Sequence, residues 1–520
     1  MLTKATEETL QLLMKSWESP VAAKAFNQAL GLVYYDLEPV AKQLYPVITP
    51  IRNKVPRVKG DGGTATHWKA ITGININLLS PGVEEGKRGG TVTTSEQDFV
   101  SAYRGIGLED YITFEAEWAA ENFDNVRALA VENLLRAMMI AEEQVLLNGN
   151  GGGLPLTTCP TPVATLITAG VGSMSAGGTK VFCVALTPEG LAYAGGPGVA
   201  AAGTAIQITI ARPNAGPTGG TSTYGGGSSQ VSTGSNTVTT AAANLAVYAT
   251  VTPVPGAAGY AWFCVGAQTT AAAAKLYSIT TVPCVLISAD GLGTQVASAA
   301  SADNSANSLV PDGVITQALA TTGLYNSQAS PTGAAMITAC GVSLAAGQAL
   351  AAGTPLTSDG GGSVTEILAD FKGFWDNRRL SPTEIWVGSQ EMKSLIKIVT
   401  SNGGAPLIRF NLDAKGDHQG VVAGNVVGSI LNPFTMSGGA EIPIRLHPNM
   451  VPGRILYWSD RIPYPLSNVG NVIQVKTRRD YYQIEWPLID RTYQYGVYAD
   501  ELLQIFAPFA FGVRDGIGPS

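Results

Sequence analysis

Between Leu156 and Ala302 the chain almost stops carrying charge. Five charged residues interrupt a run of Gly, Ala, Thr, Ser and Val there, namely Lys180, Glu189, Arg212, Lys275 and Asp290. The segments on either side return to an ordinary composition with charged, Trp and Tyr residues. A change this sharp is typical of a separate folding unit. Because the unit lies in the middle of the chain, we expect the two flanking segments to build one domain around an insertion.

Length and composition limit the class of protein. At 520 residues the chain exceeds what one hydrophobic core normally serves, so two or three domains are expected. Charged residues make up 14%, against about 25% in typical soluble domains. This low charge, together with 61 Gly, is compatible with surfaces that become buried against other chains, and equally with β-rich loops that expose Thr and Ser. A net charge of −7 without a Lys/Arg block argues against tight binding to phosphate backbones.

Targeting signals and disulfides are not expected. The N-terminus lacks an apolar signal core, and no run reaches the roughly 18 apolar residues needed to span a bilayer. We therefore expect a protein that is made and kept in the cytoplasm, without a membrane partner. The five cysteines form no C-x-x-C pair, and their odd number argues against a complete disulfide framework. Cys183, Cys264 and Cys284 lie in strand-like runs, which favours buried free thiols.

The low-charge segment reads as an all-β unit. Short apolar runs alternate there with Gly-, Thr- and Ser-rich turns, which predicts an antiparallel β-sandwich. The run VTPVPGAAGYAWFCV resembles the passage from the second to the third strand of fibronectin type III and related Ig-like modules, with Tyr260 and Trp262 pointing inward. The low-complexity stretch GPTGGTSTYGGGSSQVSTGSN is predicted to be a flexible loop.

The segment before the insertion contains an arm and a finger. Repeated Pro in residues 1–55 prevents long helices and favours an extended arm. Residues 56–115 contain strand-like runs on either side of a polar connector, which predicts a long two-stranded finger with an exposed tip. The tip carries mixed charge, from Glu84, Glu85, Lys87 and Arg88. These residues are either a solvated loop end or contacts to a neighbouring subunit, where opposite charges set the register.

Helices and strands are clear on both sides of the insertion. Apolar residues at three- and four-residue steps predict a helix over 124–147, ended by NGNGGG. Within it, Glu142 and Glu143 are neighbours that cannot face each other, so a solvated helix face is expected. After residue 303, SVTEILADFKGFWDNRRLSP and SQEMKSLIKIVTS read as helices on either side of the strand EIWVGS. The tail over 442–518 reads as mostly β.

The usual catalytic arrangements are not found in the sequence. The three histidines, His67, His418 and His447, lie in different segments, so structural or solvent roles are expected in place of a metal site. There is no G-x-S-x-G elbow, and the Gly-rich runs lack the Lys-Ser/Thr ending of a phosphate loop. We expect no enzyme, no metal and no cofactor.

The order of parts resembles a family of shell proteins. The stretches that carry the likeness are QDFVSAYRGIGLEDYITFEAEW, LNGNGGG, FWDNRRLSPTEIWVGSQEMKSL and RTYQYGVYADELLQIFAPFAFGVRDGIG. In combination they resemble the major capsid proteins of tailed bacteriophages, and they cover most of residues 56–155 and 363–520. The resemblance implies an α+β HK97-like capsid fold with an inserted all-β Ig-like sandwich.

The resemblance also implies a division of the chain. The parts are an N-terminal arm (1–55), an E-loop β-hairpin (56–115), the spine helix of a P-domain (116–155), the Ig-like β-sandwich insertion (156–302), mainly an A-domain (303–440), and return strands of the P-domain and A-domain (441–520). An arm of 55 residues is too short for the cleaved scaffolding segment of some relatives, so a separate scaffold protein or none is implied. The insertion is expected on the outer surface.

The implied function is mechanical. Many copies would assemble into hexamers and pentamers of an icosahedral phage head, in the host cytoplasm, and would hold packaged double-stranded DNA without sequence preference. Scaffold, portal and decoration proteins are the other expected partners, and the virion is the final location. Two alternatives stay open. An encapsulin-type shell would need a cargo-peptide pocket and no Ig-like insertion. A tail or surface adhesin would explain the sandwich but not the long helix.

Overall fold

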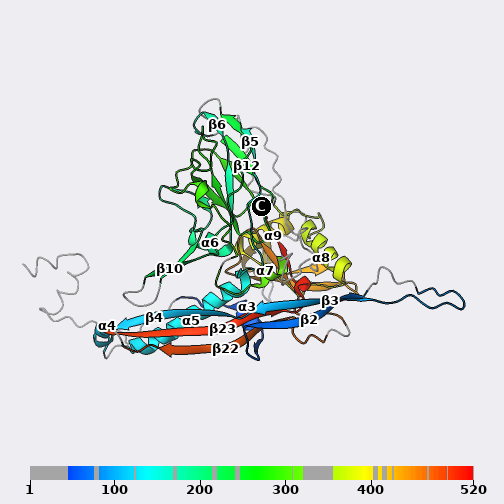
Figure 1. Cartoon of the computed structure of the whole chain (residues 1–520). Coiled ribbons are helices and arrows are strands. Elements are labelled where there is room, and N and C mark those ends of the chain that lie inside the picture. Colours follow the sequence, from blue (N-terminus) through cyan, green and yellow to red (C-terminus); the bar gives the residue numbers. More distant parts are fainter. Residues whose placement is uncertain are drawn as a thin grey trace, which may run out of the picture.

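The computed structural model describes residues 45–74, 81–121, 124–167, 172–213, 220–240, 246–306, 308–319, 355–401, 408–412, 418–423, 427–464, 468–488 and 490–518. The fold is α+β, with an elongated base from which a β-rich unit stands up (Figure 1). Within this part of the chain, no helix is both long and apolar enough to cross a membrane. The expected arm lies mostly outside the described residues. Its last part contains the short helix α3 (Pro50–Lys54).

A four-stranded sheet and one long helix form the base. Across the sheet lie β1 (Arg57–Lys59), β22 (Ile473–Glu485), β23 (Thr492–Ile505) and β4 (Arg104–Thr113). Helix α5 (Val126–Asn148) packs on this sheet, and Leu134 and Met138 meet Ile106, Tyr495 and Val497 in a common core. The Asn125 side chain caps the helix by accepting a hydrogen bond from Ala128 N at 3.2 Å. The predicted helix over 124–147 is confirmed.

The finger is shorter than the sequence suggested. Strands β2 (Ala65–Ile74) and β3 (Thr94–Ala102) pair only with each other, from Ala65 opposite Ala102 to Ile74 opposite Thr94. The chain then turns at Tyr103, and β4 joins the base sheet beside β23. The strand-like run DYITFEA, residues 110–116, is strand only as far as Thr113. Helix α4 (Phe114–Ala119) begins there, because the Thr113 hydroxyl accepts a hydrogen bond from Ala116 N and caps the helix.

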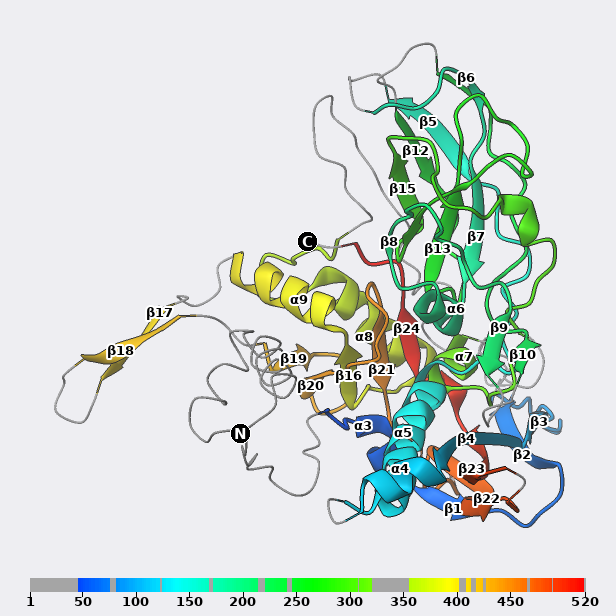
Figure 2. The same ribbon diagram turned by 90° about the vertical axis from the view of Figure 1, so that its left-hand side faces the viewer.

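A second α/β layer lies beside the base. Its sheet contains β19 (Ser429–Asn432), β20 (Ala440–Leu446), β16 (Glu384–Val387), β21 (Ile455–Trp458) and β24 (Gly512–Arg514), in that order. Helices α8 (Thr365–Arg378) and α9 (Ser389–Ser401) accompany it, and their predicted positions are confirmed (Figure 2). The remaining elements are α7 (Val314–Leu319), the 3-10 turn η5 (Pro508–Ala510) and the separate ribbon β17 (Ile408–Leu412) and β18 (His418–Ala423). Large apolar side chains such as Phe371, Phe374 and Trp458 fill the core.

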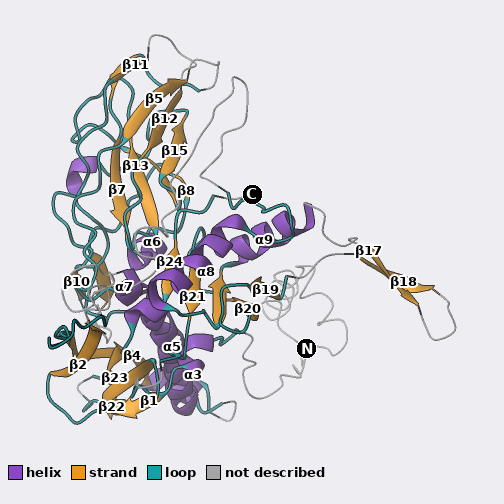
Figure 3. Cartoon of the chain, turned by 90° about the vertical axis from the view of Figure 1, so that its right-hand side faces the viewer, coloured by secondary structure: helices purple, strands orange, loops and turns teal. Residues whose placement is uncertain are grey.

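The two larger sheets of the insertion are antiparallel (Figure 3). One has the order β15 (Cys284–Ile287), β12 (Ala246–Thr250), β5 (Val163–Ile167), and the other has the order β7 (Phe182–Leu186), β13 (Gly259–Phe263), β14 (Leu276–Thr280), β8 (Gly198–Val199). Val247 and Ala249 of one sheet share a buried cluster with Cys183, Tyr260 and Trp262 of the other. Smaller elements complete the unit: β6 (Gly177–Thr179), α6 (Pro188–Tyr193), β9 (Ile210–Pro213), β10 (Thr221–Tyr224), β11 (Val238–Thr240) and η2 (Ala297–Ala299).

The strand order of the insertion differs from that of an Ig domain. The passage from β12 through the Gly256 turn (φ +83°) to β13 does cross from one sheet to the other, and Tyr260 and Trp262 are buried as expected. In Ig-type domains the neighbour of the third strand in its sheet is a strand late in the sequence. Here β13 lies between β7, which precedes β12 in the chain, and β14, which is the next strand after β13. The Ig-like character of the insertion therefore remains a prediction.

The low-complexity stretch is residues 216–236, of which 216–219 lie outside the described residues. The described part, residues 220–236, is not the predicted flexible loop. Its last part lies against the edge of β7, where Ser229, Ser232 and Ser235 are all buried. Each serine donates its backbone N–H to a carbonyl of residue 185, 183 or 181, and its hydroxyl accepts the N–H of that same residue, all at 2.9–3.0 Å. The serines at every third position thus satisfy a strand edge that would otherwise be open.

The cysteines are only partly as expected. Cys159, Cys183 and Cys264 are buried and free. Cys284 is disulfide-bonded, so the prediction of a free thiol is wrong for this residue. Its sequence environment is strand-like, as for the other two, and local pattern therefore could not separate it from them.

Candidate assembly interface

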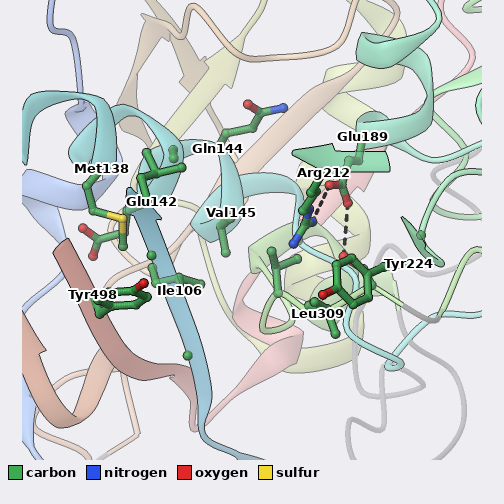
Figure 4. A pocket seen from close by; sticks show the side chains of 18 of the residues that line it. Ile106, Met138, Glu142, Gln144, Val145, Glu189, Arg212, Tyr224, Leu309 and Tyr498 are labelled. Carbon is green, nitrogen blue, oxygen red and sulfur yellow. Dashed lines mark hydrogen bonds and ion pairs between the residues drawn. The ribbon is translucent and has the colours of Figure 1, made fainter. Parts of the chain in front are cut away.

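A groove lies between the base and the foot of the insertion. One wall is β4 from Gly105 to Tyr111, with Met138 and Val145 of α5 beside it (Figure 4). The facing wall comes from the insertion and includes Glu189, Arg212 and Tyr224. The groove has a volume of about 1240 Å³. This volume is larger than that of most small-molecule sites.

The insertion wall of the groove is held by an ion pair. Arg212 Nη2 lies 2.7 Å from Glu189 Oε1, and the Ser308 hydroxyl donates to Glu189 Oε2 at 3.1 Å. The Arg212 guanidinium also lies over the Tyr224 ring, 5.8 Å from its centroid. Both partners of the ion pair are partly buried, so their side chains are held in place. The wall is formed by residues of α6, β9 and β10.

The two connections of the insertion are tied to β4. Arg104, the first residue of β4, donates to Gly151 O at 2.6 Å and to Ser308 O at 3.2 Å. On the other side, Asp312 Oδ1 accepts the N–H groups of Gly151 and Gly153 at 2.8 and 3.1 Å. The segment that enters the insertion, at Gly151, and the segment that leaves it, at Ser308, are therefore fixed to each other and to the base sheet. This arrangement sets the width of the groove.

The free edge of β4 faces this groove. In the described residues β4 pairs with β23 on one side, and no strand pairs with its other side. Leu108 and Tyr111 are 37% and 43% exposed. Glu109 accepts a hydrogen bond from the Tyr498 hydroxyl, and Asp110 accepts one from Tyr111 N. Neither carboxylate forms an ion pair with a described residue. An open strand edge with exposed apolar residues and two unneutralised carboxylates is suited to docking another chain.

The four charged residues predicted for the finger tip do lie together. Glu84, Glu85, Lys87 and Arg88 are all exposed, and a turn closes where Lys87 N donates to Glu84 O at 3.0 Å. None of the four takes part in an ion pair with the described residues. Their role as inter-subunit contacts remains a prediction.

The prediction of a solvated face at Glu142 and Glu143 is wrong, because both side chains are fully buried. Glu143 accepts the N–H groups of Ile51 and Arg52 at 2.9 and 2.7 Å, and its Oε1 lies 2.6 Å from His447 Nε2. His447 Nδ1 accepts Asn449 N at 3.1 Å, so the ring proton is on Nε2 and is donated to Glu143. His447 thus has the structural role expected for it, but it is not isolated.

Glu142 belongs to a second buried cluster. It contacts Arg52 Nε at 2.7 Å, the Arg57 guanidinium and the Tyr481 hydroxyl. Arg57 also reaches Glu501 Oε2 at 3.0 Å. Burial, and next the nearby negative charge of Glu142, raise the pKa of Glu501 to about 8. We call the two clusters together the seam, because they attach residues 51–57 to α5, β22 and β23.

The seam could not have been found from helical periodicity. A sequence signal did exist, in the two arginines of an otherwise Pro-rich segment, Arg52 and Arg57, which need carboxylate partners if that segment is buried. The segment covers the end of α5 from one side and His447 covers it from another, so this turn of the helix has no solvated face.

No protein-family model and no curated protein matches the sequence. Solved structures that resemble the chain come from protein shells. The chain is similar over 96% of its length to 99% of a chain in the capsid of a native GTA particle, with 8% identity and a TM-score of 0.40. It is similar over 94% to 98% of a capsid chain of the Myoviridae phage XM1, with 7% identity and a TM-score of 0.37.

A third similar structure is a cellular shell. The chain is similar over 95% of its length to 95% of a chain in the holo-SrpI encapsulin complex from Synechococcus elongatus PCC 7942, with 8% identity and a TM-score of 0.35. At these identities and TM-scores the likenesses are weak.

Proposed function

We propose that this chain is the major capsid protein of a tailed bacteriophage, with an HK97-like fold. In this proposal β2 and β3 are the E-loop, α5 is the spine helix of the P-domain, and the five-stranded sheet with α8 and α9 is the A-domain. Many copies form hexamers and pentamers of an icosahedral head around double-stranded DNA. Scaffold, portal and decoration proteins are the further partners.

One observation carries the proposal. The β2–β3 hairpin extends from one end of the elongated base, while α4 and the end of β4 lie at the opposite end (Figure 1). Ile71 and Ile74 on the hairpin are 69% and 48% exposed. A projecting element that ends in an exposed tip at one end, with a strand edge open at the other, supports head-to-tail contact between copies, which closes into rings when the rotation permits.

The position of the insertion supports a place on the outer surface. It stands up from the base, whereas the hairpin continues along the base and projects from its end, and the foot of the insertion is the part nearest the base (Figures 1 and 2). A unit attached only at its foot can project from a shell without interrupting contacts between the bases of neighbouring copies. The net charge of −7 is compatible with a shell that encloses DNA and binds its phosphates only weakly.

Electron microscopy of the purified full chain tests this function directly. We expect closed shells, and we expect a variant lacking residues 81–90 to stay folded and yet form no complete particles. The matched control replaces the same ten residues with a Gly/Ser loop of equal length, which keeps the length of the hairpin but removes the tip residues. Normal shells from the deletion variant, or fibres or monomers from the wild type, would contradict the proposal.

A further inference from the structure

The seam contains two buried carboxyl groups in contact with each other. Glu142 on α5 and Glu501 on β23 are both fully buried, and their carboxyl groups are joined by a hydrogen bond. Ionised carboxylates can only accept hydrogen bonds, so a bond between two carboxyl groups needs a proton on one of them. The pair is therefore suited to hold one proton inside the protein.

The charges around the pair also favour one proton. Arg57 contacts Glu142 and Glu501 through its two Nη atoms. Arg52 Nε is the second cationic group, 2.7 Å from Glu142, and Asp480 on the exposed side lies 2.7 Å from Arg57 Nη2. With every carboxyl group ionised, three negative charges would meet two positive ones at a largely buried site. One bound proton balances the cluster.

Hydrogen bonding places the proton on Glu501. Glu142 accepts from three donors, namely Arg52 Nε, Arg57 Nη1 and the Tyr481 hydroxyl, and these stabilise its ionised form. Glu501 Oε2 accepts from Arg57, whereas Glu501 Oε1 is buried and no donor of the described chain reaches it. Burial, and next the charge of Glu142, hold the pKa of Glu501 at about 8.

The remaining charged groups around Glu501 are bound elsewhere. Arg104 lies opposite Glu501 on β4, but its guanidinium donates to backbone carbonyls at the two connections of the insertion. Glu143, the next residue of α5, accepts N–H groups of α3 and contacts His447. Lys59, at the end of β1, is exposed. Titration of Glu501 therefore changes the charge of the seam at the point where Arg57 is held.

We propose that the proton shared by Glu142 and Glu501 is a latch for the N-terminal segment: while it is bound, residues 51–57 stay attached to α5, and its loss favours their release. Without the proton, two buried carboxylates remain in contact, and opening of the segment lets water reach both. The segment can move by itself, because β1 is three residues long and pairs only with β22 in the described sheet. The inference goes beyond the proposed function, since it concerns a single chain.

The proton changes the population of a state that other contacts also stabilise. Ile51 and Val55 are buried in the main core beside Leu146 and Leu147 of α5, so the segment stays attached in most molecules at low pH. The attached state binds a proton that the released state does not. The ratio of released to attached molecules should therefore rise about tenfold per pH unit, and level off above the pKa of Glu501.

Hydrogen exchange of the amides of residues 51–59 in the purified full chain measures the release. After correction for the intrinsic pH dependence of exchange, opening in the wild type should increase about tenfold per pH unit across neutral pH. Glu501→Gln keeps a neutral side chain that can donate to Glu142, and its opening should not change with pH. The control Glu384→Gln removes the carboxylate that lies 2.5 Å from Lys54 Nζ. It loosens the same segment without touching the proton, so opening should rise by one factor at every pH.

An infrared titration of the wild type covers the case in which Glu501→Gln folds poorly. Protonated carboxyl groups absorb separately from carboxylates, so the bound proton is observed directly. Absorbance of a protonated carboxyl should be lost as the pH passes through about 8, the pKa of Glu501.

The outcomes are independent of shell formation, which electron microscopy decides. Wild-type opening that does not change with pH overturns the latch, as does an equally steep rise in Glu501→Gln. A flat profile in Glu384→Gln would assign the pH dependence to that carboxylate and overturn the latch too. So would an infrared titration without loss of protonated carboxyl near the pKa of Glu501.

Discussion

Glu143 Oε1 lies 2.6 Å from His447 Nε2, and neither side chain is exposed to solvent. The same carboxylate also accepts the N–H groups of Ile51 and Arg52. One side chain therefore joins the end of α5 to the loop after β20 and to the last part of the N-terminal segment. In a shell this seam would attach the arm of each subunit to its long helix.

Glu143→Ala should lower the free energy of unfolding by about 3 kcal/mol, because it leaves the buried Ile51 N–H, the partly buried Arg52 N–H and the buried His447 Nε2–H without an acceptor. Chemical denaturation followed by circular dichroism measures the change. Glu132→Ala on the exposed face of the same helix is the control and should cost under about 0.5 kcal/mol. Equal losses in the two variants would show that Glu143 is not buried in this network.

Glu501→Gln should change how stability depends on pH. The folded protein raises the pKa of this carboxyl from 4.5 to about 8, so between these values the folded state binds a proton that the unfolded state does not. The contribution to stability is complete below pH 4.5, falls as the pH rises, and is lost above about pH 8. Thermal melts from pH 5 to 9 should show the wild type losing stability more steeply than Glu501→Gln. Parallel curves would exclude a raised pKa.

Ser232→Ala should destabilise the insertion by about 1–3 kcal/mol. It removes the hydroxyl that accepts Cys183 N at 2.9 Å and leaves this buried N–H unpaired. Thr233→Ala, at the exposed neighbouring position, keeps the chain path and should have little effect. Hydrogen exchange of the Cys183 amide is the sensitive readout. Unchanged protection in Ser232→Ala would mean that the serine ladder does not close this edge.

Leu134→Ala should cost about 2–5 kcal/mol, because it empties a site packed between α5 and the base sheet, where Leu134 is 6% exposed. Gln144→Ala, exposed on the same helix, is the control and should stay within about 0.5 kcal/mol of the wild type. Thermal unfolding of both variants makes the comparison. A similar melting temperature in the two would mean that α5 packs through a different face.

The long helix and the elements over 363–401 could be predicted from local pattern. The apolar spacing and the Asn148–Gly153 stop predicted α5, and the residues over 363–401 predicted α8, β16 and α9. The β-rich character of the insertion and the inward position of Tyr260 and Trp262 also followed from the sequence. These features depend on residues within one or two turns of each other, and the physical cause is present in any short segment of the chain.

Partnerships between distant segments could not be predicted in this way. Periodicity places Glu142 and Glu143 on a helix, but only residues 51–57 and His447, about 90 and 300 positions away, make their environment buried. Ser229, Ser232 and Ser235 resemble linker residues until β7 supplies the groups they pair with. The groove likewise exists only where β4 meets the foot of the insertion. Burial is a property of the assembled chain, since a polar side chain becomes structural only when folding removes its water and supplies a partner.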